Sequence, residues 1–304
     1  MNKQFEEIVS QIGKVILGKE EQIRLALTCL FAKGHLLIED IPGIGKTTLA
    51  HAISKSLGLN FCRIQCTSDM LPSDILGVSV FDQKISAFVF HPGPIFTNVL
   101  LTDEINRTTP KTQSALLEAM EERQVTVEGK TRILDNPFFV IATQNPLEQA
   151  GTFPLPESQL DRFLMRINIG YPDANAEREL LKIGETKKVL NSISSVLSPG
   201  DVIKIQDEIP SVFVSDALIE YVYKLLSYTR TSSYFFVGLS PRAGLSLLCA
   251  SKSRAFFAGR NFVLPEDVQY VLTWVTSHRL KSRDDLQEFS HEKLRTIFSE
   301  VSLP

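Results

Sequence analysis

The 304-residue sequence has no uninterrupted apolar run of about 18 residues and no signal-peptide pattern at its N-terminus. It also has little excess charge, with a net charge of -3 at neutral pH, so no overall field attracts a polyanion. There are only four cysteines, and Cys62 and Cys66 have no further Cys or His ligands nearby that would complete a metal site. We therefore expect a cytoplasmic protein with reduced thiols, without membrane insertion, whose 43% apolar residues build one or two cored domains.

Short apolar runs alternate with helical patterns through the first half of the chain. The runs predict strands at residues 36–40, 60–66, 98–104, 138–146 and 163–172. The helical patterns cover 1–32 with a break at 17–19, then 47–58 and 114–124. This alternation predicts a five-stranded parallel sheet with helices on both faces. Ligands of such sheets bind beyond the carboxyl ends of the strands, so the polar residues that follow each run are site candidates.

Two segments interrupt this rhythm, and the last third of the chain has a different character. Alternating apolar and polar residues at 76–92 and 123–134 predict two β-hairpin insertions. Helical patterns follow at 172–185, 215–230, 240–260 and 265–280, with a Ser/Pro/Gly-rich connector at 191–201. We therefore predict an α/β core at 1–172 and an all-helical lid domain at 173–304.

The stretch IEDIPGIGKTTLA follows the first strand and opens a helix, which is the context of a phosphate-binding loop. Glycines let main-chain N–H groups at a helix N-terminus approach phosphate oxygens. Lys46 would reach the β- and γ-phosphates, and Thr47 would ligate Mg²⁺. Asp40 stands where the usual pattern has glycine, and a plain strand–turn–helix is the alternative. The expected nucleotide-binding residues of this loop are Asp40, Pro42, Gly43, Ile44, Gly45, Lys46, Thr47 and Thr48.

Further site candidates follow the later strands. Asp103 and Glu104 end an apolar strand, where Asp103 would hold the Mg²⁺ water shell and Glu104 would act as general base. Asn145 follows the fourth strand and would orient the attacking water, although asparagine is also an ordinary turn residue before proline. Arg162 precedes the fifth strand and would reach a neighbouring subunit's γ-phosphate, unless it only pairs with Asp161.

In this order, these elements resemble an AAA+ ATPase of the MoxR family. The matching stretches are LLIEDIPGIGKTTLA, TDEINRTTPKTQSALLEAMEERQVTVEG, IATQNPLEQAGTFPLPESQLDRFLMRI and GLSPRA, and the resemblance covers nearly the whole chain. Family members carry an acidic pair before the loop, which accounts for Asp40. The resemblance implies an adenine contact around Gly18, a sensor 1 at Asn145, an arginine finger at Arg162 and a sensor 2 at Arg242. Considered without the resemblance, Arg242 would be a solvated residue at the start of a helix. The resemblance leaves open whether Arg242 acts in its own site or in a neighbour's site.

The resemblance also implies a hexameric ring that uses ATP and Mg²⁺ for chaperone-like remodelling of partner complexes, by metal insertion among other means. It implies a von Willebrand factor A domain protein and its client complex as partners, and the chain leaves no room for that domain itself. A nucleic-acid motor of the minichromosome-maintenance type shares the two insertions. The negative net charge and nearly neutral hairpin tips make nucleic acid an unlikely partner. A switch without turnover is disfavoured by Glu104 and Arg162.

Overall fold

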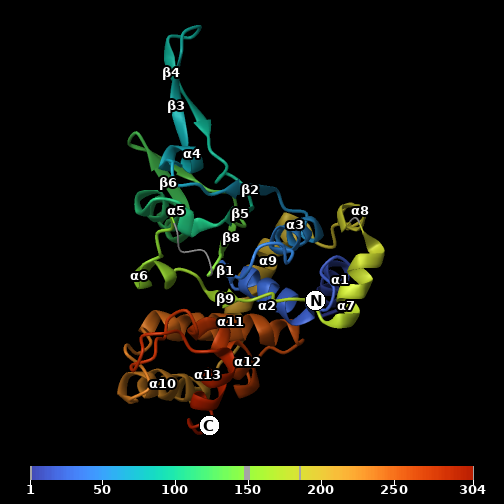
Figure 1. Ribbon diagram of the computed structural model, residues 1–304, viewed down its shortest axis with the longest axis vertical. Helices are drawn as coiled ribbons and strands as arrows, with labels where there is room; N and C mark the ends of the chain where they lie inside the picture. Colours follow the sequence, from blue (N-terminus) through green and yellow to red (C-terminus); the bar gives the residue numbers. More distant parts are fainter. Residues whose placement is uncertain (1, 147–150, 185, 304) are drawn as a thin grey trace.

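The computed structural model describes residues 2–146, 151–184 and 186–303 (Figure 1). Its centre is a five-stranded parallel sheet in the order β2-β5-β8-β1-β9. The strands are β1 (Leu36–Glu39), β2 (Phe61–Gln65), β5 (Val99–Asp103), β8 (Phe139–Gln144) and β9 (Met165–Ile167). This confirms the predicted strand number and direction, and it puts the end of β8 between the ends of β1 and β5.

Successive side chains of the strands pack on opposite faces of the sheet, as in parallel sheets buried on both sides. Leu36 and Ile38 join a core with α1 (Asn2–Gly13), α2 (Glu20–Phe31) and α3 (Lys46–Ser56). Leu37 joins a second core with α5 (Pro110–Glu122) on the other face. Helices therefore cover both faces, as predicted. The helix α5 begins four residues before the predicted start, because the Thr109 side chain caps it and Pro110 occupies its first turn.

Both predicted hairpins are present. β3 (Gly77–Asp82) and β4 (Ala87–Pro92) form an arm that projects far from the body (Figure 1). β6 (Gln124–Val127) pairs with β7 (Lys130–Ile133). Short helical segments lie between these elements: α4 (Pro72–Leu76), η1 (Ile105–Arg107) and α6 (Glu157–Leu160).

The carboxyl-terminal third is helical, as expected from the sequence. Its helices are α7 (Ala174–Ile183), α8 (Thr186–Asn191), α9 (Pro199–Glu208), α10 (Asp216–Thr231), α11 (Pro241–Phe257), α12 (Pro265–Thr276) and α13 (His291–Phe298), with η2 (Ile209–Ser211) after α9. α9 contacts α2, α11 packs against α2 and α12 packs against β9. The domain boundary at residue 172 stays a prediction.

Among the carboxyl-terminal helices, α8, α9 and α13 were not predicted from the sequence. The connector predicted at 191–201 is shorter, because α9 already begins at Pro199. Ser198 and Asp201 cap its N-terminus reciprocally, a pattern that the sequence does contain. Glu185, at the end of the predicted helix 172–185, lies outside the described residues, as do residues 147–150 of a family-like stretch. In the described part of the chain, no helix is both long and apolar enough to cross a bilayer.

Candidate nucleotide-binding site

The loop between β1 and α3 has the backbone conformation that binds phosphate. Gly43 and Gly45 have φ values of 87° and 96°, and Gly45 is the N-cap of α3. A Cβ atom added at Gly43 would meet open space, so the main chain there faces a cavity. Main-chain N–H groups of this kind, at the start of a helix, form an anion site without any side chain.

Lys46 lies at the first position of α3 and is only 8% exposed. Its Nζ donates a hydrogen bond of 2.6 Å to the main-chain carbonyl of Asp40. Burial lowers the pKa of Lys46, while the nearby carboxylates of Asp103, Asp40 and Glu104 favour its charged form. A buried ammonium with three carboxylates around it provides the cation that a triphosphate requires.

Asp40, at the position of the missing glycine, uses its side chain on the main chain. One carboxylate oxygen accepts from the N–H of Ile41 at 2.9 Å, and the other accepts from the N–H of Gly170 at 2.6 Å. Asp40 therefore ties the start of the loop to the segment that follows β9. Its placement leaves the phosphate cradle open and removes the objection raised by the missing glycine.

Asp103 and Glu104 lie at the carboxyl end of β5 and line the same cavity as the loop. The Thr143 hydroxyl donates to the Asp103 carboxylate at 2.6 Å and accepts from the main-chain N–H of Glu104 at 2.9 Å. Glu104 has φ 58° and ψ 51°, a left-handed conformation that costs a non-glycine residue about 1 kcal/mol or more. Thr143 holds both acids, and sequence reasoning missed it.

Three more side chains that the sequence analysis missed contact these acids. Arg63 pairs with Asp103 at 2.7 Å, and Gln65 donates to Glu104 at 2.9 Å. Arg107 pairs with Glu104 at 3.1 Å. Arg63 and Gln65 are two residues apart on β2, so they share one face of the strand. That alternation near the end of a strand was the only signal for them in the sequence.

Two adjoining cavities fit the two halves of a nucleotide. The first, of about 390 Å³, is polar and is lined by the loop, Lys46, Thr47, Arg63, Asp103 and Glu104. The second, of about 480 Å³, is more apolar and lies among Val15–Leu17, Tyr171 and Leu180. The loop residues Pro42, Gly43, Gly45 and Thr48 line both, and Ile44 lines the second. Gly18, with φ 70°, lies between Leu17 and Lys19, which line the second cavity, but Gly18 itself is not among the described lining residues.

The donors present also suit magnesium. Mg²⁺ keeps several waters and takes few protein oxygens, so the Thr47 hydroxyl and the Asp103 carboxylate are sufficient. Both line the phosphate-sized cavity. The described residues contain no group of three or more His, Cys, Asp or Glu that would hold a metal alone.

The other predicted residues come from later elements of the chain, and Asn145 lies next to the start of the loop, because the carbonyl of Gln144 accepts from the main-chain N–H of Asp40 at 3.0 Å. Asn145 follows the last residue of β8 and is half-buried. Arg162 and Arg242 are not among the described residues that line the phosphate cavity, but both line another cavity beside α5. There both arginines pair with the single carboxylate of Glu121, Arg162 at 3.0 Å. Asp161, the alternative partner of Arg162, instead binds Arg279 at 2.6 Å.

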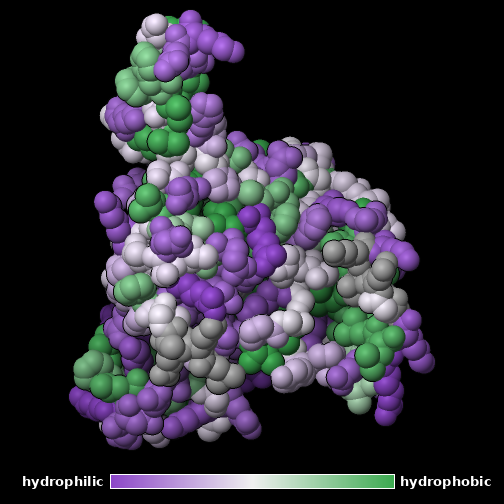
Figure 2. Space-filling model, turned by 45° about the horizontal axis from the view of Figure 1, so that its top comes forward, coloured by the Kyte–Doolittle hydropathy of each residue, from purple (hydrophilic) through white to green (hydrophobic). Residues whose placement is uncertain are grey.

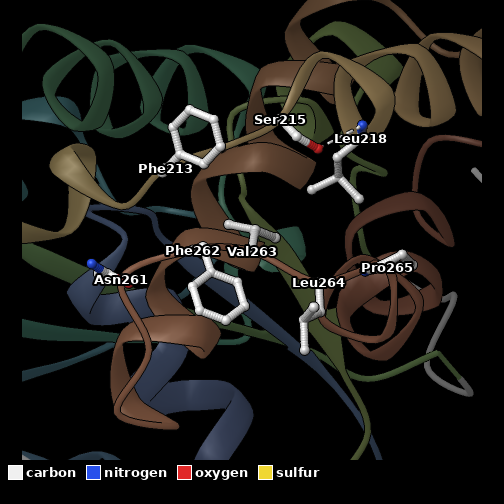
Figure 3. Close-up of a pocket in the computed structure, with 8 residues that line it drawn as sticks. All are labelled: Phe213, Ser215, Leu218, Asn261, Phe262, Val263, Leu264 and Pro265. Carbon is white, nitrogen blue, oxygen red and sulfur yellow. Dashed lines mark hydrogen bonds between the residues drawn. The ribbon is translucent and has the colours of Figure 1, made fainter.

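A fourth cavity, in the lid, has a different character (Figure 3). It measures about 570 Å³ and lies between the segment before α10, which carries Phe213, and the segment before α12, which carries Phe262. No charged side chain is among its described lining residues. Its described lining therefore offers no cation to a triphosphate, although the cavity is larger than the phosphate cavity.

Comparison with known proteins agrees with this geometry. The model of the ATPase family associated with various cellular activities (AAA) matches residues 35–165, and an AAA lid model matches 227–300. The chain is 46% identical to the uncharacterized protein YeaC of Bacillus subtilis, over 97% of this chain and 93% of that one. It is 38% identical to the chaperone MoxR1 of Mycobacterium tuberculosis, over 99% and 82%. A crystal structure from Cytophaga hutchinsonii superposes with a TM-score of 0.91 at 37% identity, covering 99% and 94% of the two chains.

Proposed function

Because this chain belongs to the MoxR family of AAA+ ATPases, we propose that it hydrolyses ATP and uses the energy for chaperone-like remodelling of other proteins. One observation carries the hydrolysis: Lys46 and Thr47 share a cavity with Asp103 and Glu104. A phosphate cradle, a magnesium ligand and a carboxylate base in one cavity are the parts that phosphoryl transfer to water requires.

Each residue has a definite task in this proposal. The N–H groups from Gly43 to Thr48 and the Lys46 ammonium bind the phosphates, and the Ile16–Lys19 segment contacts the base. Thr47 and Asp103 hold Mg²⁺, which neutralises charge on the phosphates when bound. Glu104 takes a proton from the attacking water, which Asn145 orients. Gln65 and Arg107 both contact Oε2 of Glu104 in the structure, so they hold the carboxylate in position.

The position of Arg162 and Arg242 supports a ring as the active form. Both pair with Glu121, beside a cavity separate from the one that holds Lys46. Two cations without a phosphate site of their own suit the γ-phosphate of a neighbouring subunit, where an arginine accelerates hydrolysis by about 10³–10⁵-fold. Since one carboxylate holds both, we assign both to the neighbour's site and propose the hexamer of the family resemblance.

Mixing two inactive variants tests this arrangement. Glu104→Gln removes the base and Arg162→Ala removes the cation, so each variant alone should be inactive. In mixed rings, an Arg162→Ala subunit keeps its Glu104 and receives an intact Arg162 from a Glu104→Gln neighbour, so activity should return. Arg242→Ala should be rescued in the same way. No recovery in rings shown to be mixed would contradict action across the interface.

The β3–β4 arm supports remodelling of proteins over work on nucleic acid. Phe81 and Phe88 form an edge-to-face pair with ring centroids 5.4 Å apart, and they are 50% and 72% exposed. Figure 2 shows hydrophobic residues along the arm, which stands clear of the body. Asp82 and Lys84 at its tip cancel in charge, whereas binding to nucleic acid requires clustered cations. Phe90, in contrast, packs at the base against Phe96 and Arg132.

We therefore propose that the arm contacts an apolar client segment, and that a separate von Willebrand factor A domain protein delivers clients such as metal-dependent complexes. Phe81→Ser with Phe88→Ser should leave basal ATP turnover unchanged and abolish its stimulation by an unfolded apolar polypeptide. Phe90→Ser is the matched comparison. Phe90 packs at the base of the arm, so its loss should lower the stability of the arm, whereas the loss of Phe81 and Phe88 removes only exposed aromatic surface. Stimulation by DNA that depends on salt would favour a nucleic-acid motor instead.

A further inference from the structure

The guanidinium of Arg63 lies in the nucleotide cavity, on the carboxylate that is expected to serve magnesium. One of its nitrogens, Nη2, is 2.7 Å from Asp103 Oδ2 and donates at 2.8 Å to Gln65 Oε1. Arg63 lines the cavity together with Gly43, Lys46 and Thr47. A cation of the chain therefore neutralises Asp103 at the position where the family mechanism needs a metal.

Both oxygens of the Asp103 carboxylate are in use. Thr143 donates to Oδ1 at 2.6 Å, and Arg63 binds Oδ2. The Thr143 bond fixes the orientation of the carboxylate and can persist with magnesium present. The Arg63 bond, in contrast, cannot persist when magnesium binds, because the guanidinium and hydrated Mg²⁺ compete for the same carboxylate.

The solvent exposure of the two partners differs in the direction that exchange requires. The Asp103 side chain is 13% exposed and is held at the end of β5, whereas the Arg63 side chain is 45% exposed. β2 is at the edge of the sheet, beyond β5, so Arg63 has solvent on one side. The arginine can leave Asp103 without disturbing the core, and the cavity that it lines would bring it close to bound phosphates.

We propose that Arg63 exchanges with magnesium at Asp103 and so sets the magnesium dependence of nucleotide binding. This inference rests on the proposed nucleotide site. With Arg63 in place, the site tolerates nucleotide without metal, because a cation already balances Asp103. Without it, the uncompensated Asp103 carboxylate repels metal-free nucleotide and attracts Mg²⁺ more strongly.

Binding of a fluorescent ATP analogue at graded free Mg²⁺, and in EDTA, tests this exchange. In Arg63→Ala, the Mg²⁺ concentration at half-saturation should fall about three- to tenfold, and affinity in EDTA should weaken by a similar factor. Arg63→Lys keeps the charge but not the planar fork, and should give shifts of the same sign and smaller size. Arg24→Ala removes an arginine from a surface ion-pair cluster with Glu6 and Glu20, and should match the wild type.

The opposite signs of the two effects separate exchange from a structural role, which would weaken binding with and without metal alike. An unchanged or raised magnesium requirement in Arg63→Ala would overturn the proposal. Lys46→Ala distinguishes this failure from failure of the nucleotide site itself. If the wild-type protein and Lys46→Ala bind the analogue equally, the nucleotide site is wrong, whatever Arg63 does.

Discussion

Thr143 lies on β8 and Glu104 directly follows the adjacent strand β5, and the Thr143 hydroxyl oxygen accepts a hydrogen bond of 2.9 Å from the main-chain N–H of Glu104. The same hydroxyl donates its proton to Asp103 at 2.6 Å. Glu104 has left-handed backbone angles that need such support. One fully buried hydroxyl therefore fixes both the expected base and the expected magnesium ligand.

Thr143→Val keeps the shape of the side chain and removes both hydrogen bonds. Side chains that hydrogen-bond to a metal ligand are worth about 10–100-fold in activity, so we expect kcat for ATP to fall by about that factor. ATP affinity should change little, because Lys46 and the loop remain. Thr143→Ser keeps the hydroxyl and should retain most of the activity. Equal rates for Thr143→Val and the wild type would remove Thr143 from the positioning role.

Glu104→Gln tests the general base directly. The amide is similar in size to the carboxylate but cannot take a proton from water, so turnover should fall by about 10²–10⁴-fold. Nucleotide affinity should stay near the wild-type value, since removing a negative charge near the phosphates does not weaken their binding. Single-turnover hydrolysis and equilibrium binding measure the two effects. Hydrolysis at the wild-type rate would assign the base to another residue.

The sequence alone predicts those parts of the site whose residues are contiguous in the chain. Lys46 and Thr47 open a helix after a strand, and Asp103 and Glu104 end one, so each pair is visible in a short window. The α/β order likewise predicts the parallel sheet, and all five strands form where the apolar runs stand.

The missed residues act through partners that are distant in sequence. Thr143 and Arg63 each reach Asp103 from 40 residues away, across neighbouring strands. Their contacts depend on the strand order. In this order, β8 lies between β5 and β1, whereas β2 lies at the edge of the sheet. No local periodicity encodes that order. Glu121 was missed for the same reason, because it lies on α5 and Arg242 follows 121 residues later.

Asp40→Gly would give the loop its usual glycine, and we expect this change to be harmful. It removes the acceptors of the Ile41 and Gly170 N–H groups, which costs about 1–3 kcal/mol for each group left unsatisfied. Thermal unfolding should move to a lower temperature, and nucleotide affinity should fall because the Gly170 segment also lines the base cavity. Asp40→Asn keeps one acceptor, so its unfolding temperature and its nucleotide affinity should lie between those of the wild type and Asp40→Gly. A glycine variant as stable as the wild type would contradict the role given to Asp40.

Glu121→Gln tests the shared support of the two arginines. The amide cannot pair with both cations, so Arg162 and Arg242 should lose their orientation and turnover in the assembled ring should fall about tenfold. ATP affinity should not change, because Glu121 is not among the described residues lining the phosphate cavity. Glu122→Gln, on the next and exposed residue, is the matched control and should behave as wild type. Equal losses in both variants would point to a general effect on α5.

Buried imidazoles make the stability of the fold sensitive to mild acid. His35 is 5% exposed, and its Nδ1 accepts from the N–H of Val140, so the proton is on Nε2, 3.1 Å from the carbonyl of Met120. Burial lowers the pKa of His35 to about 4. The unfolded chain, with an ordinary pKa near 6.5, then binds more protons than the folded chain at intermediate pH. The stabilisation is therefore complete above pH about 6.5 and is lost as the pH falls through about 4.

His35→Phe removes this titration and should flatten the pH dependence. Between pH 7.5 and 5.5, His35 alone should account for about 1 kcal/mol of lost unfolding free energy, measured by urea denaturation at both values. The variant will be less stable at pH 7.5, because the Val140 N–H and the Met120 carbonyl lose their partner, so only the change with pH is diagnostic. His91→Phe, at an exposed position on the hairpin, controls for the loss of an imidazole. If His35→Phe keeps the full wild-type slope, His35 binds as many protons in the folded chain as in the unfolded chain, and burial does not lower its pKa.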